Sequence, residues 1–368
     1  MATIGLQISE RVPLGDRPAV ARSGDPLPGR ELQGYLLNGV SRTFALTIPQ
    51  LPARLAWVVA NAYLLCRIVD TIEDEPALTV GQKRYFCERF VEVVAGASEA
   101  QAFANELAPR LSDATSIAEQ ELVRLTPEVV RVTEKLNGAQ RGALLRCIRV
   151  MAQGMAGFQE AKDPHGLQNI AELERYCYYV AGVVGEMLTT LFCDHSPLVA
   201  RNRDALMGLA VSFGQGLQMT NILKDIWDDQ SRGACWLPQD VFSQAGFDLL
   251  ELEPGRFRPG FGQGLARLIG VTYGHLSNAL AYTLLLPRQE TGIRNFCLWN
   301  IGMAVLTLRK IHRHPDFDRS QQVKISRRSV MATIVASRLT AAHDHLLRAL
   351  FHMGGIGLPR GRPRQTPV

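Results

Sequence analysis

The 368-residue chain lacks the sequence features of a secreted, disulfide-rich or zinc-binding protein. No two of its seven cysteines form a Cys-x-x-Cys pair, and their number is odd. This pattern predicts buried free thiols in a reducing compartment rather than a disulfide framework or a zinc site. The N-terminal segment carries Glu10 and Asp16 among prolines and glycines, so it has no apolar signal-peptide core. The cysteines are Cys66, Cys87, Cys147, Cys177, Cys193, Cys235 and Cys297.

The chain also has little net charge and no long hydrophobic run. It contains 40 Lys and Arg against 35 Asp and Glu, for a net charge of +5, which argues against a nucleic-acid-binding protein. The basic excess includes Arg360, Arg362 and Arg364 and is compatible with weak attraction to anionic membranes or substrates. The longest apolar stretches, 55–66 and 296–308, are shorter than the roughly 20 residues of a membrane span. We therefore predict a cytoplasmic protein without a signal peptide or transmembrane anchor.

Alternating strand-like patterns are almost absent from the sequence. Apolar residues instead recur at i, i+3 and i+4 among Ala, Leu, Gln, Arg and Glu, which predicts helices. Breakers such as 163–166 and 253–255 divide the chain into helices, and no linker separates it into halves. The sequence predicts an all-α protein with one helical catalytic domain at 31–351, a flexible N-terminal arm at 1–30 and a flexible basic tail at 352–368.

The first feature that indicates a functional site is an acidic cluster at the end of an apolar segment, 61–75. Asp70, Glu73 and Asp74 stand at i, i+3 and i+4, so a helix places them on one face. Tyr63 and Arg67 continue that face toward the N-terminus. Three like charges destabilise a bare helix, whereas Mg²⁺ prefers such oxygen ligands together with water and phosphates. Arg67 is suited to hold a phosphate oxygen; a solvated acidic helix end is the alternative for this segment alone.

The segment 214–229 repeats the same spacing. Asn221 and Asp225 are at i and i+4, and Asp225 is followed by Asp228 and Asp229 at i+3 and i+4. Basic and amide side chains accompany them, at Gln218, Lys224 and Arg232. Two such helices facing each other in a bundle would form a metal–diphosphate site, and their apolar flanks would line a hydrocarbon chain.

A third segment, 176–186, lies between the two acidic ones. Gly182 and Gly185 weaken a helix relative to alanine, so they mark a place where a ligand or another helix comes close. The spacing alone leaves both alternatives open.

Together these segments resemble the squalene and phytoene synthase family, from about residue 34 to 336. The matching motifs are Asp-Thr-Ile-Glu-Asp at 70–74, Tyr-Cys-x-x-Val-Ala-Gly-x-Val-Gly at 176–185 and Asn-Ile-x-x-Asp-x-x-x-Asp at 221–229. Arg232, Trp-Leu-Pro at 236–238 and Ser-x-x-Phe at 41–44 complete the likeness. The resemblance implies an all-α isoprenoid-synthase bundle with a central cavity, in which magnesium assists the head-to-head joining of two prenyl diphosphates.

The resemblance also implies roles for individual residues. The expected metal ligands are Asp70, Glu73, Asp74, Asn221, Asp225, Asp228 and Asp229. The expected substrate-binding residues are Ser41, Phe44, Arg67, Gln218, Asn221 and Arg232. The expected catalytic residues are Tyr176, Tyr63, Arg67 and Lys224, where a tyrosine serves as a proton relay or as a π-face partner of a cation and the basic groups stabilise the departing diphosphate.

Within the family, the reductive branch makes squalene from two farnesyl diphosphates and NADPH. The stretches 296–308, beginning Phe-Cys, and 323–327, Val-Lys-Ile-Ser-Arg, are similar to that branch. The resemblance assigns Arg42, Lys324 and Arg327 to NADPH. The chain departs from the pattern at Ser326, where Arg is usual, at Asn300 in place of a common Pro, and at Lys224 in place of a common Arg.

Alternative functions follow from the same residues. A non-reductive enzyme of the family would give dehydrosqualene, phytoene or presqualene diphosphate. A prenyl-lipid binder without catalysis would have no reason to retain two sets of buried carboxylates, and a terpene cyclase would not explain the 176–185 motif. No Gly-x-Gly-x-x-Gly follows a strand, so a Rossmann site is not expected. Peripheral membrane contact is compatible with a hydrocarbon product, and the sequence does not set the oligomeric state.

Overall fold

A computed structural model of the chain describes residues 27, 29–160 and 165–361. The predicted arm at 1–30 and the end of the predicted tail, 362–368, lie largely or wholly outside the described residues. Of the described residues, 77% are helical, and these residues contain no strand, only an isolated bridge between Leu167 and Pro238. The predicted all-α class is therefore confirmed. The described residues form two compact helical units, which we treat in turn.

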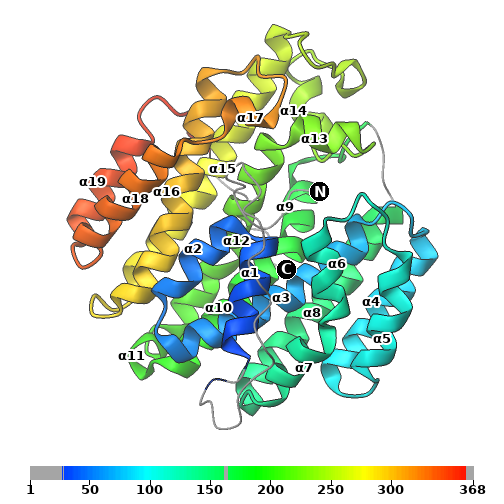
Figure 1. The fold of residues 1–368 in the computed structure, drawn as a ribbon. Helices are drawn as coiled ribbons and strands as arrows, with labels where there is room; N and C mark the ends of the chain where they lie inside the picture. Colours follow the sequence, from blue (N-terminus) through cyan, green and yellow to red (C-terminus); the bar gives the residue numbers. More distant parts are fainter. Residues whose placement is uncertain (1–26, 28, 161–164, 362–368) are drawn as a thin grey trace. The chain divides into compact units, whose positions relative to one another are not determined.

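The N-terminal unit comprises the described residues within Glu10–Ala161 together with Met187–Ala200. Its long helices α3 and α8 pack on each other, and α4 packs on both (Figure 1). Its helices are α1 (Arg30–Val40), α2 (Arg42–Thr47), α3 (Ala53–Asp74), α4 (Val80–Ala95), α5 (Ala100–Leu107), α6 (Ile117–Arg124), α7 (Thr126–Glu134), α8 (Gly138–Glu160), most of α10 (Val183–His195) and α11 (Pro197–Ala200).

Helix α3 is the core of the N-terminal unit because it is buried on every side. Nearly all of its side chains from Leu55 to Glu73 are buried, as expected for a helix that is apolar all round. Two helical stretches, Ala53–Asp74 and Ile170–His195, are long and apolar enough to cross a membrane, and 94% and 67% of their most apolar windows are buried. Since core helices of globular proteins pass the same test, this property alone does not indicate a membrane span.

Local capping explains where two helices of this unit begin. Thr79 and Gln82 form a reciprocal capping box at the start of α4, and Ser116 and Glu119 form another at the start of α6. Each box satisfies backbone N–H groups that a helix leaves open in its first turn. Helix α4 ends at Gly96, whose φ of 77° lies in the left-handed region that favours glycine.

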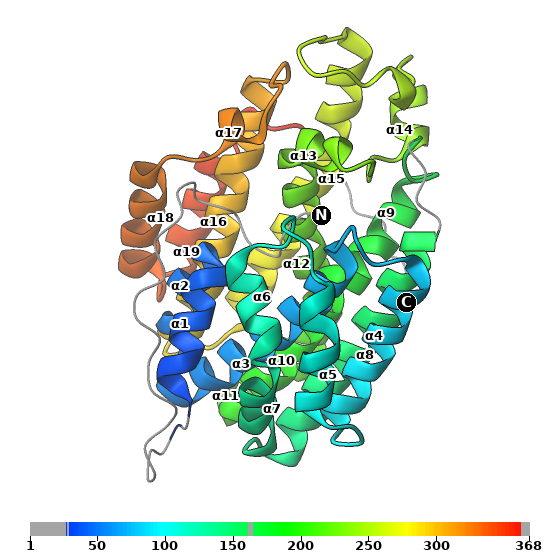
Figure 2. The same cartoon turned by 45° about the vertical axis from the view of Figure 1, so that its right-hand side comes forward.

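The C-terminal unit comprises the described residues within Lys162–Glu186 and Arg201–Val368. Helices α12, α15 and α16 pack against one another, and Gly216 on α12 lets α15 come close at His275 and Leu276 (Figures 1 and 2). Its helices are α9 (Ile170–Cys177), α12 (Arg203–Lys224), α13 (Ile226–Ser231), α14 (Gln239–Ser243), α15 (Pro259–Leu285), α16 (Thr291–Arg313), α17 (Ser320–Val323), α18 (Arg327–Thr340) and α19 (Asp344–Gly354).

A buried polar network joins three helices of the C-terminal unit. His275 of α15 hydrogen-bonds the Ser212 hydroxyl of α12 through Nδ1 at 2.8 Å and faces Glu174 of α9 through Nε2 at 3.3 Å. Gln215 donates to the Glu174 backbone carbonyl at 2.9 Å. These contacts satisfy polar groups that would otherwise be costly to bury.

The cysteines match the prediction from the sequence. All seven are free, six of them are buried, and Cys235 is half-buried. Burial raises the pKa of the Cys297 thiol to about 12, so this group stays protonated and unreactive at neutral pH.

The C-terminal end is ordered beyond the boundary predicted at residue 351. Helix α19 continues to Gly354, Leu358 is buried, and the Gly361 N–H donates to the Gly270 carbonyl at 3.1 Å. The proline and glycine content of this segment suggested a loose tail. Burial of Leu358 and the backbone contact with α15 explain why its described part is held instead.

An ion-pair cluster fastens the start of α19 to α16. Arg294, which is fully buried on α16, lies 2.5 Å from the Asp344 carboxylate, and Arg288 lies 2.7 Å from its other oxygen. Burial alone would raise the pKa of Asp344, but hydrogen bonds and charge from Arg294 and Arg288 lower it below its usual value. A lowered pKa means that the ionised form stabilises the fold.

We expect Asp344→Asn to lower the free energy of unfolding by about 2 kcal/mol, because it leaves the buried Arg294 charge unpaired. The contribution should be present above the unfolded-state pKa of about 4 and be lost as pH falls through the lower folded-state value. Urea unfolding of both proteins at pH 7 and at pH 3 measures this difference. Asp318→Asn, which removes an exposed pair with Arg319, is the control and should change stability by less than about 0.5 kcal/mol. Equal unfolding free energies for Asp344→Asn and the parent at pH 7 would contradict a stabilising role for this ion-pair cluster.

Candidate active site

In the N-terminal unit, Arg67 lies at the centre of the predicted first site. It pairs with Glu119 of α6, and its Nη1 lies 3.9 Å from Asp70 Oδ2. Glu119 therefore partly neutralises the guanidinium expected to hold phosphate. Burial opposes the charge on Arg67, but Glu119 and nearby groups raise its pKa above the usual value. Arg67 Nε and Nη1 have no hydrogen-bond partner among the described residues, so both can still donate to an anionic ligand.

The first acidic cluster divides between two environments. Asp70 is 4% exposed, and burial raises its pKa to about 7 against the opposing effect of Arg67, with Asp74 raising it further. The backbone carbonyl of Glu73 instead accepts a hydrogen bond from Lys83 of α4. Asp70 and Asp74 thus stand one turn apart beside Arg67, whereas Glu73 lies near Lys83.

Glu75, directly after α3, serves the fold rather than the acidic face. Its carboxylate accepts hydrogen bonds from Ala77 N–H at 2.8 Å, from Ser112 N–H at 2.8 Å and from the Ser112 and Thr115 hydroxyls at 2.5 and 2.7 Å. Burial would raise the pKa of Glu75, but these hydrogen bonds lower it. They anchor the end of α3, which carries the acidic cluster, to the segment before α6.

Three other predicted residues of this unit meet one turn before Arg67. Ser41 accepts from the Phe44 N–H at 3.1 Å and so caps α2, which begins at Arg42. The Phe44 ring centroid lies 4.9 Å from that of Tyr63. Burial raises the pKa of Tyr63 to about 12 against the effects of Arg67 and Ser41, so its phenol stays protonated. Arg42 is half-buried on α2.

In the C-terminal unit, the second cluster forms a stripe along α12 and α13. Gln218, Asn221, Asp225 and Asp229 follow at intervals of three and four residues, and backbone hydrogen bonds run from Asp225 to Asn221 and from Asp229 to Asp225. Their helical faces therefore align across the junction between the two helices. Gln218 is 1% exposed, and neither atom of its amide has a hydrogen-bond partner among the described residues.

Basic groups accompany the second stripe. Lys224 Nζ lies 3.1 Å from Asp225 Oδ2, and Arg232 donates to Asp229 Oδ1 at 2.8 Å. Burial raises the pKa of Asp225 against the effect of Lys224, and burial also raises that of Asp229. Asp228 differs from its neighbours because it is exposed. Of the acidic residues predicted as ligands in this unit, Asp225 is half-buried and Asp229 is buried, and the negative charge of these two needs compensation.

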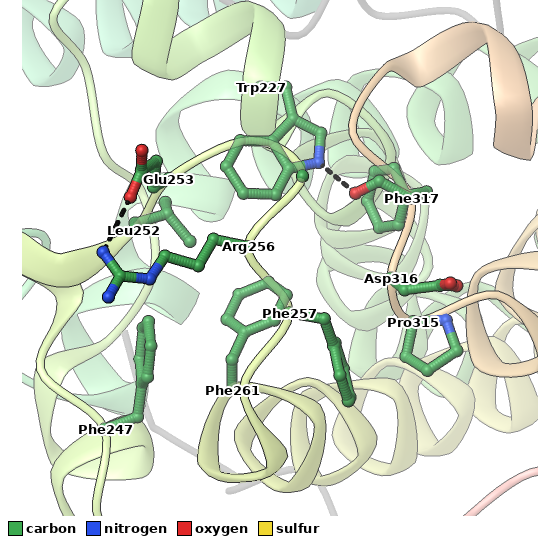
Figure 3. Close-up of a pocket in the computed structure, with 11 residues that line it drawn as sticks. Trp227, Phe247, Leu252, Glu253, Arg256, Phe257, Phe261, Pro315, Asp316 and Phe317 are labelled. Atoms are coloured by element: carbon green, nitrogen blue, oxygen red, sulfur yellow. Dashed lines mark hydrogen bonds and ion pairs between the residues drawn. The ribbon is translucent and has the colours of Figure 1, made fainter.

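The opposite side of α13 is anchored by Trp227. Its indole N–H donates to the Phe317 carbonyl at 2.6 Å, and its ring packs near Phe261 and Phe317. Figure 3 shows these rings beside a small pocket that Phe247 and Phe257 also line, where Arg256 pairs with Glu253 at 3.1 Å. Helix α13 is thereby tied to the segment that follows α16.

Tyr176, a predicted catalytic residue, is brought close to the second stripe by Trp236. The two rings are stacked with centroids 4.0 Å apart and planes 7° apart, and Tyr176 is fully buried. Trp236 and Asp229 both line a second small pocket beside Ile222 and Ile226. The stack fixes the orientation of the Tyr176 ring relative to this side of the stripe.

The glycine motif after Tyr176 forms a π-helical turn, Tyr178–Gly182, between α9 and α10. A Cβ on Gly185 would lie 2.1 Å from the Ala210 carbonyl oxygen, and one on Gly214 would lie 2.1 Å from that of Ala181. The glycines therefore permit close approach of α12, which decides between the two alternatives left open by the sequence. π turns of this kind are frequent at functional sites.

Two of the three residues predicted to contact NADPH lie in the C-terminal unit. Lys324 is half-buried, and its backbone carbonyl accepts from Lys310 Nζ at 2.6 Å. Arg327 is exposed at the first turn of α18. Ser326 caps α18 by accepting from the Ser329 N–H at 3.1 Å, which accounts for a serine where the family usually has arginine. Arg42, the third residue, belongs to the N-terminal unit.

The carboxylates present fit a divalent cation that is completed by ligand oxygens. No group of three or more His, Cys, Asp or Glu residues within the described ranges is close enough to hold a metal by itself. Mg²⁺ commonly uses one or two carboxylates, with water and phosphate as the other ligands. Buried Asp70 Oδ1 has no hydrogen-bond partner among the described residues, and the raised pKa values of Asp70 and Asp225 show that their negative charge is poorly compensated. A cation would supply that compensation.

Sequence comparison decides the family of this chain. The squalene/phytoene synthase family pattern matches residues 37–329. The chain belongs to the squalene/phytoene synthase family. Among curated relatives, it is 30% identical over 295 residues to a squalene synthase of Gibberella zeae, covering 79% of this chain and 60% of that protein. It is 29% identical over 307 residues to a squalene synthase of Schizosaccharomyces pombe, covering 82% and 64%. The chain thus spans less than two thirds of the length of these relatives.

Solved structures show the fold of the family. The structure of TcSQS in complex with a ligand matches with a TM-score of 0.70 at 21% identity, covering 90% of this chain and 93% of that one. A dehydrosqualene synthase in complex with a ligand matches with a TM-score of 0.62 at 17% identity, covering 84% and 94%. These likenesses confirm the predicted isoprenoid-synthase fold.

Proposed function

We propose that this chain is a squalene synthase, which condenses two farnesyl diphosphates head to head to presqualene diphosphate and reduces this to squalene with NADPH. The observation that carries the proposal is the presence of two carboxylate pairs, Asp70 with Asp74 and Asp225 with Asp229, each with one buried and one half-buried member, in a chain of this family. Curated squalene synthases at about 30% identity support the reductive branch. In a non-catalytic lipid-binding protein, removing these charges from water would cost free energy without a compensating role.

Magnesium would be held by Asp70 and Asp74 in the N-terminal unit and by Asn221, Asp225 and Asp229 in the C-terminal unit, where it would neutralise diphosphate charge as the carbon–oxygen bond breaks. In the N-terminal unit, Arg67 has Nε and Nη1 donors available for a diphosphate, and in the C-terminal unit, Lys224 places a buried ammonium group beside Asp225. These preorganised positive groups favour ionisation because charge accumulates on the leaving diphosphate in the transition state. Gln218, with both amide atoms available, is suited to orient a diphosphate or a bound water.

The first half-reaction breaks the carbon–oxygen bond of the donor and forms an allylic cation. The double bond of the second farnesyl diphosphate attacks this cation, and loss of a proton to the released diphosphate closes a cyclopropane, giving presqualene diphosphate. Tyr63 stays protonated at neutral pH because its pKa is about 12, so it can pass a proton on only while it accepts another. Tyr176 is held flat against Trp236, which suits a π-face contact with a cation.

The second half-reaction releases the remaining diphosphate and rearranges the cyclopropyl cation. When bound, NADPH would supply the hydride that reduces this cation to squalene. We assign Arg42, Lys324 and Arg327 to the phosphates of NADPH. Apolar side chains around the stripe, such as Ile222 and Ile226, keep water away from a cation that would otherwise form an alcohol.

One observation favours a non-reductive rival that makes dehydrosqualene. Ser326, in the stretch assigned to NADPH, is engaged in capping α18, so the usual basic contact at this position is missing. The rival keeps the metal and diphosphate residues and lacks only the hydride step.

Product analysis tests the proposal. The purified chain is incubated with farnesyl diphosphate and Mg²⁺, with and without NADPH, and the extracted lipids are identified by gas chromatography and mass spectrometry. We expect squalene only in the presence of NADPH, and no product when EDTA removes the metal. Dehydrosqualene or presqualene diphosphate with and without NADPH would support the rival. No consumption of farnesyl diphosphate would contradict both, and geranylgeranyl diphosphate then tests for a longer substrate.

A further inference from the structure

Exposed apolar side chains gather at one end of the C-terminal unit. Within the described ranges, eleven large hydrophobic residues are exposed, and six of them lie between residues 331 and 356. These six are Met331, Val335, Leu339, Leu346, Met353 and Ile356, with exposed fractions from 40% to 73%. Such a concentration is unusual on a globular surface and marks an interaction site.

The exposed residues of α18 form a regular stripe. Met331, Val335 and Leu339 stand at i, i+4 and i+8, so they share one face of the helix. Val330 and Ile334 are buried, because α18 packs on α16 through its other face, where Gly302 of α16 gives room for Thr333. Helix α18 thus has two apolar faces, one packed on α16 and one exposed.

Helix α19 lies beside α18 and also packs on α16 (Figures 1 and 2). Leu347 is buried and Phe351 stacks on Tyr273 of α15 with ring centroids 5.0 Å apart, so these residues attach α19 to the unit. Leu346 and Met353, two turns apart, and Ile356 just after the helix remain exposed. We call the exposed faces of α18 and α19, with Ile356 and Arg360, the C-terminal apolar surface.

The charge around this surface has one sign. Residues 327–361 contain five arginines and a single acidic residue, Asp344. The carboxylate of Asp344 is already paired with Arg288 and Arg294, so it offsets little of the surrounding positive charge. Arg328, Arg348 and Arg360 are exposed. The chain as a whole is nearly balanced, at 40 basic against 35 acidic residues, so this region is locally basic.

We infer that the C-terminal apolar surface docks on a membrane that contains anionic lipid. Exposed apolar side chains flanked by arginines are the combination that binds a bilayer interface, since the side chains enter the headgroup region and the cations meet lipid phosphates. Charge complementarity selects this partner over a second copy of the chain, whose identical basic surface would repel it. The inference stands apart from the proposed reaction, because binding requires no turnover.

Vesicle sedimentation with the full chain tests the inference. The probes are vesicles of phosphatidylcholine alone and of phosphatidylcholine with 30% phosphatidylglycerol, a composition chosen as roughly that of an anionic membrane surface. We expect tighter partitioning to the anionic vesicles, by roughly tenfold or more, and a decrease at high salt because exposed charges are screened. The same measurement is made on the triple variant Met331→Gln, Val335→Gln, Leu339→Gln, and on the double variant Arg348→Gln, Arg360→Gln.

The triple variant should lose most binding to both kinds of vesicle, whereas the double variant should lose mainly the preference for anionic lipid. Matched controls remove an equally exposed apolar residue, Ile117→Gln, and two exposed arginines, Arg54→Gln with Arg84→Gln, elsewhere on the chain. Circular dichroism melts show whether each variant is folded. Unchanged binding by the folded triple variant, or no binding by the parent, overturns the inference. A parent dimer that the triple variant dissociates, without vesicle binding, overturns it in favour of self-association.

Discussion

Asp225→Asn is expected to lower farnesyl diphosphate turnover about 100-fold or more, because it removes a half-buried carboxylate that would hold magnesium against the departing diphosphate. Asp225 shares its stripe with Asn221 and Asp229, and burial raises its pKa, so its charge is poorly balanced without a cation. Replacement by an uncharged isostere should also raise the Mg²⁺ concentration needed for half-maximal rate. Steady-state rates across a magnesium titration measure both effects.

Two further variants make this prediction specific. Asp204→Asn removes an exposed carboxylate from the first turn of the same helix, α12, and should change the rate by less than about twofold because surface charges contribute little. Asp228→Asn tests the exposed member of the predicted metal set and should have a smaller effect than Asp225→Asn. If Asp225→Asn folds and turns over at the parent rate at every magnesium concentration, Asp225 is not a ligand.

Among the Gly→Ala substitutions on α12, Gly214→Ala is expected to lower stability the most. The new Cβ would lie 2.1 Å from the Ala181 carbonyl oxygen, which belongs to the π turn and cannot move as a side chain can. Overpacking against flexible neighbours costs about 1–3 kcal/mol, so a contact with rigid backbone should cost about 3 kcal/mol or more. Thermal and urea unfolding followed by circular dichroism measure the loss.

The same helix provides the control for this variant. A Cβ at Gly208 of α12 meets nothing within 4 Å, so Gly208→Ala should be neutral or gain up to about 1 kcal/mol from the higher helix propensity of alanine. Gly185→Ala, which would meet the Ala210 carbonyl oxygen at 2.1 Å, should behave like Gly214→Ala. Equal melting temperatures for Gly214→Ala and Gly208→Ala would contradict the close packing of α12.

The sequence predicted those parts of the site that depend on spacing along one helix. Periodicity indicated the helical class, and intervals of three and four residues placed Asp225 and Asp229 on a common face. Spacing could not predict burial within a cluster, because that depends on what packs on each side. Asp228 is exposed while Asp229 is 2% exposed, although both match the same acidic pattern.

The sequence pattern did not predict contacts between segments that are far apart along the chain. The partner of Arg67 is Glu119, 52 residues away, and spacing along one helix cannot predict such a pair. The Trp227 indole N–H donates to the carbonyl of Phe317, 90 residues away. Because every residue has a backbone carbonyl, the sequence does not indicate which one accepts this hydrogen bond. The stacked partner of Tyr176 is Trp236, which the family motif contained but to which the sequence assigned no contact.

The π turn at Tyr178–Gly182 has a consequence for how this chain can evolve. A π turn holds one residue more than the α-helical path it replaces, so deleting that residue would restore a regular helix. Each residue of an α-helix rotates the next by about 100°, so the deletion would swing everything after the turn away from its present direction. Gly185 would leave the Ala210 backbone, while Tyr176 before the turn would stay stacked on Trp236. The length of this segment therefore cannot change by one residue without separating the two contacts.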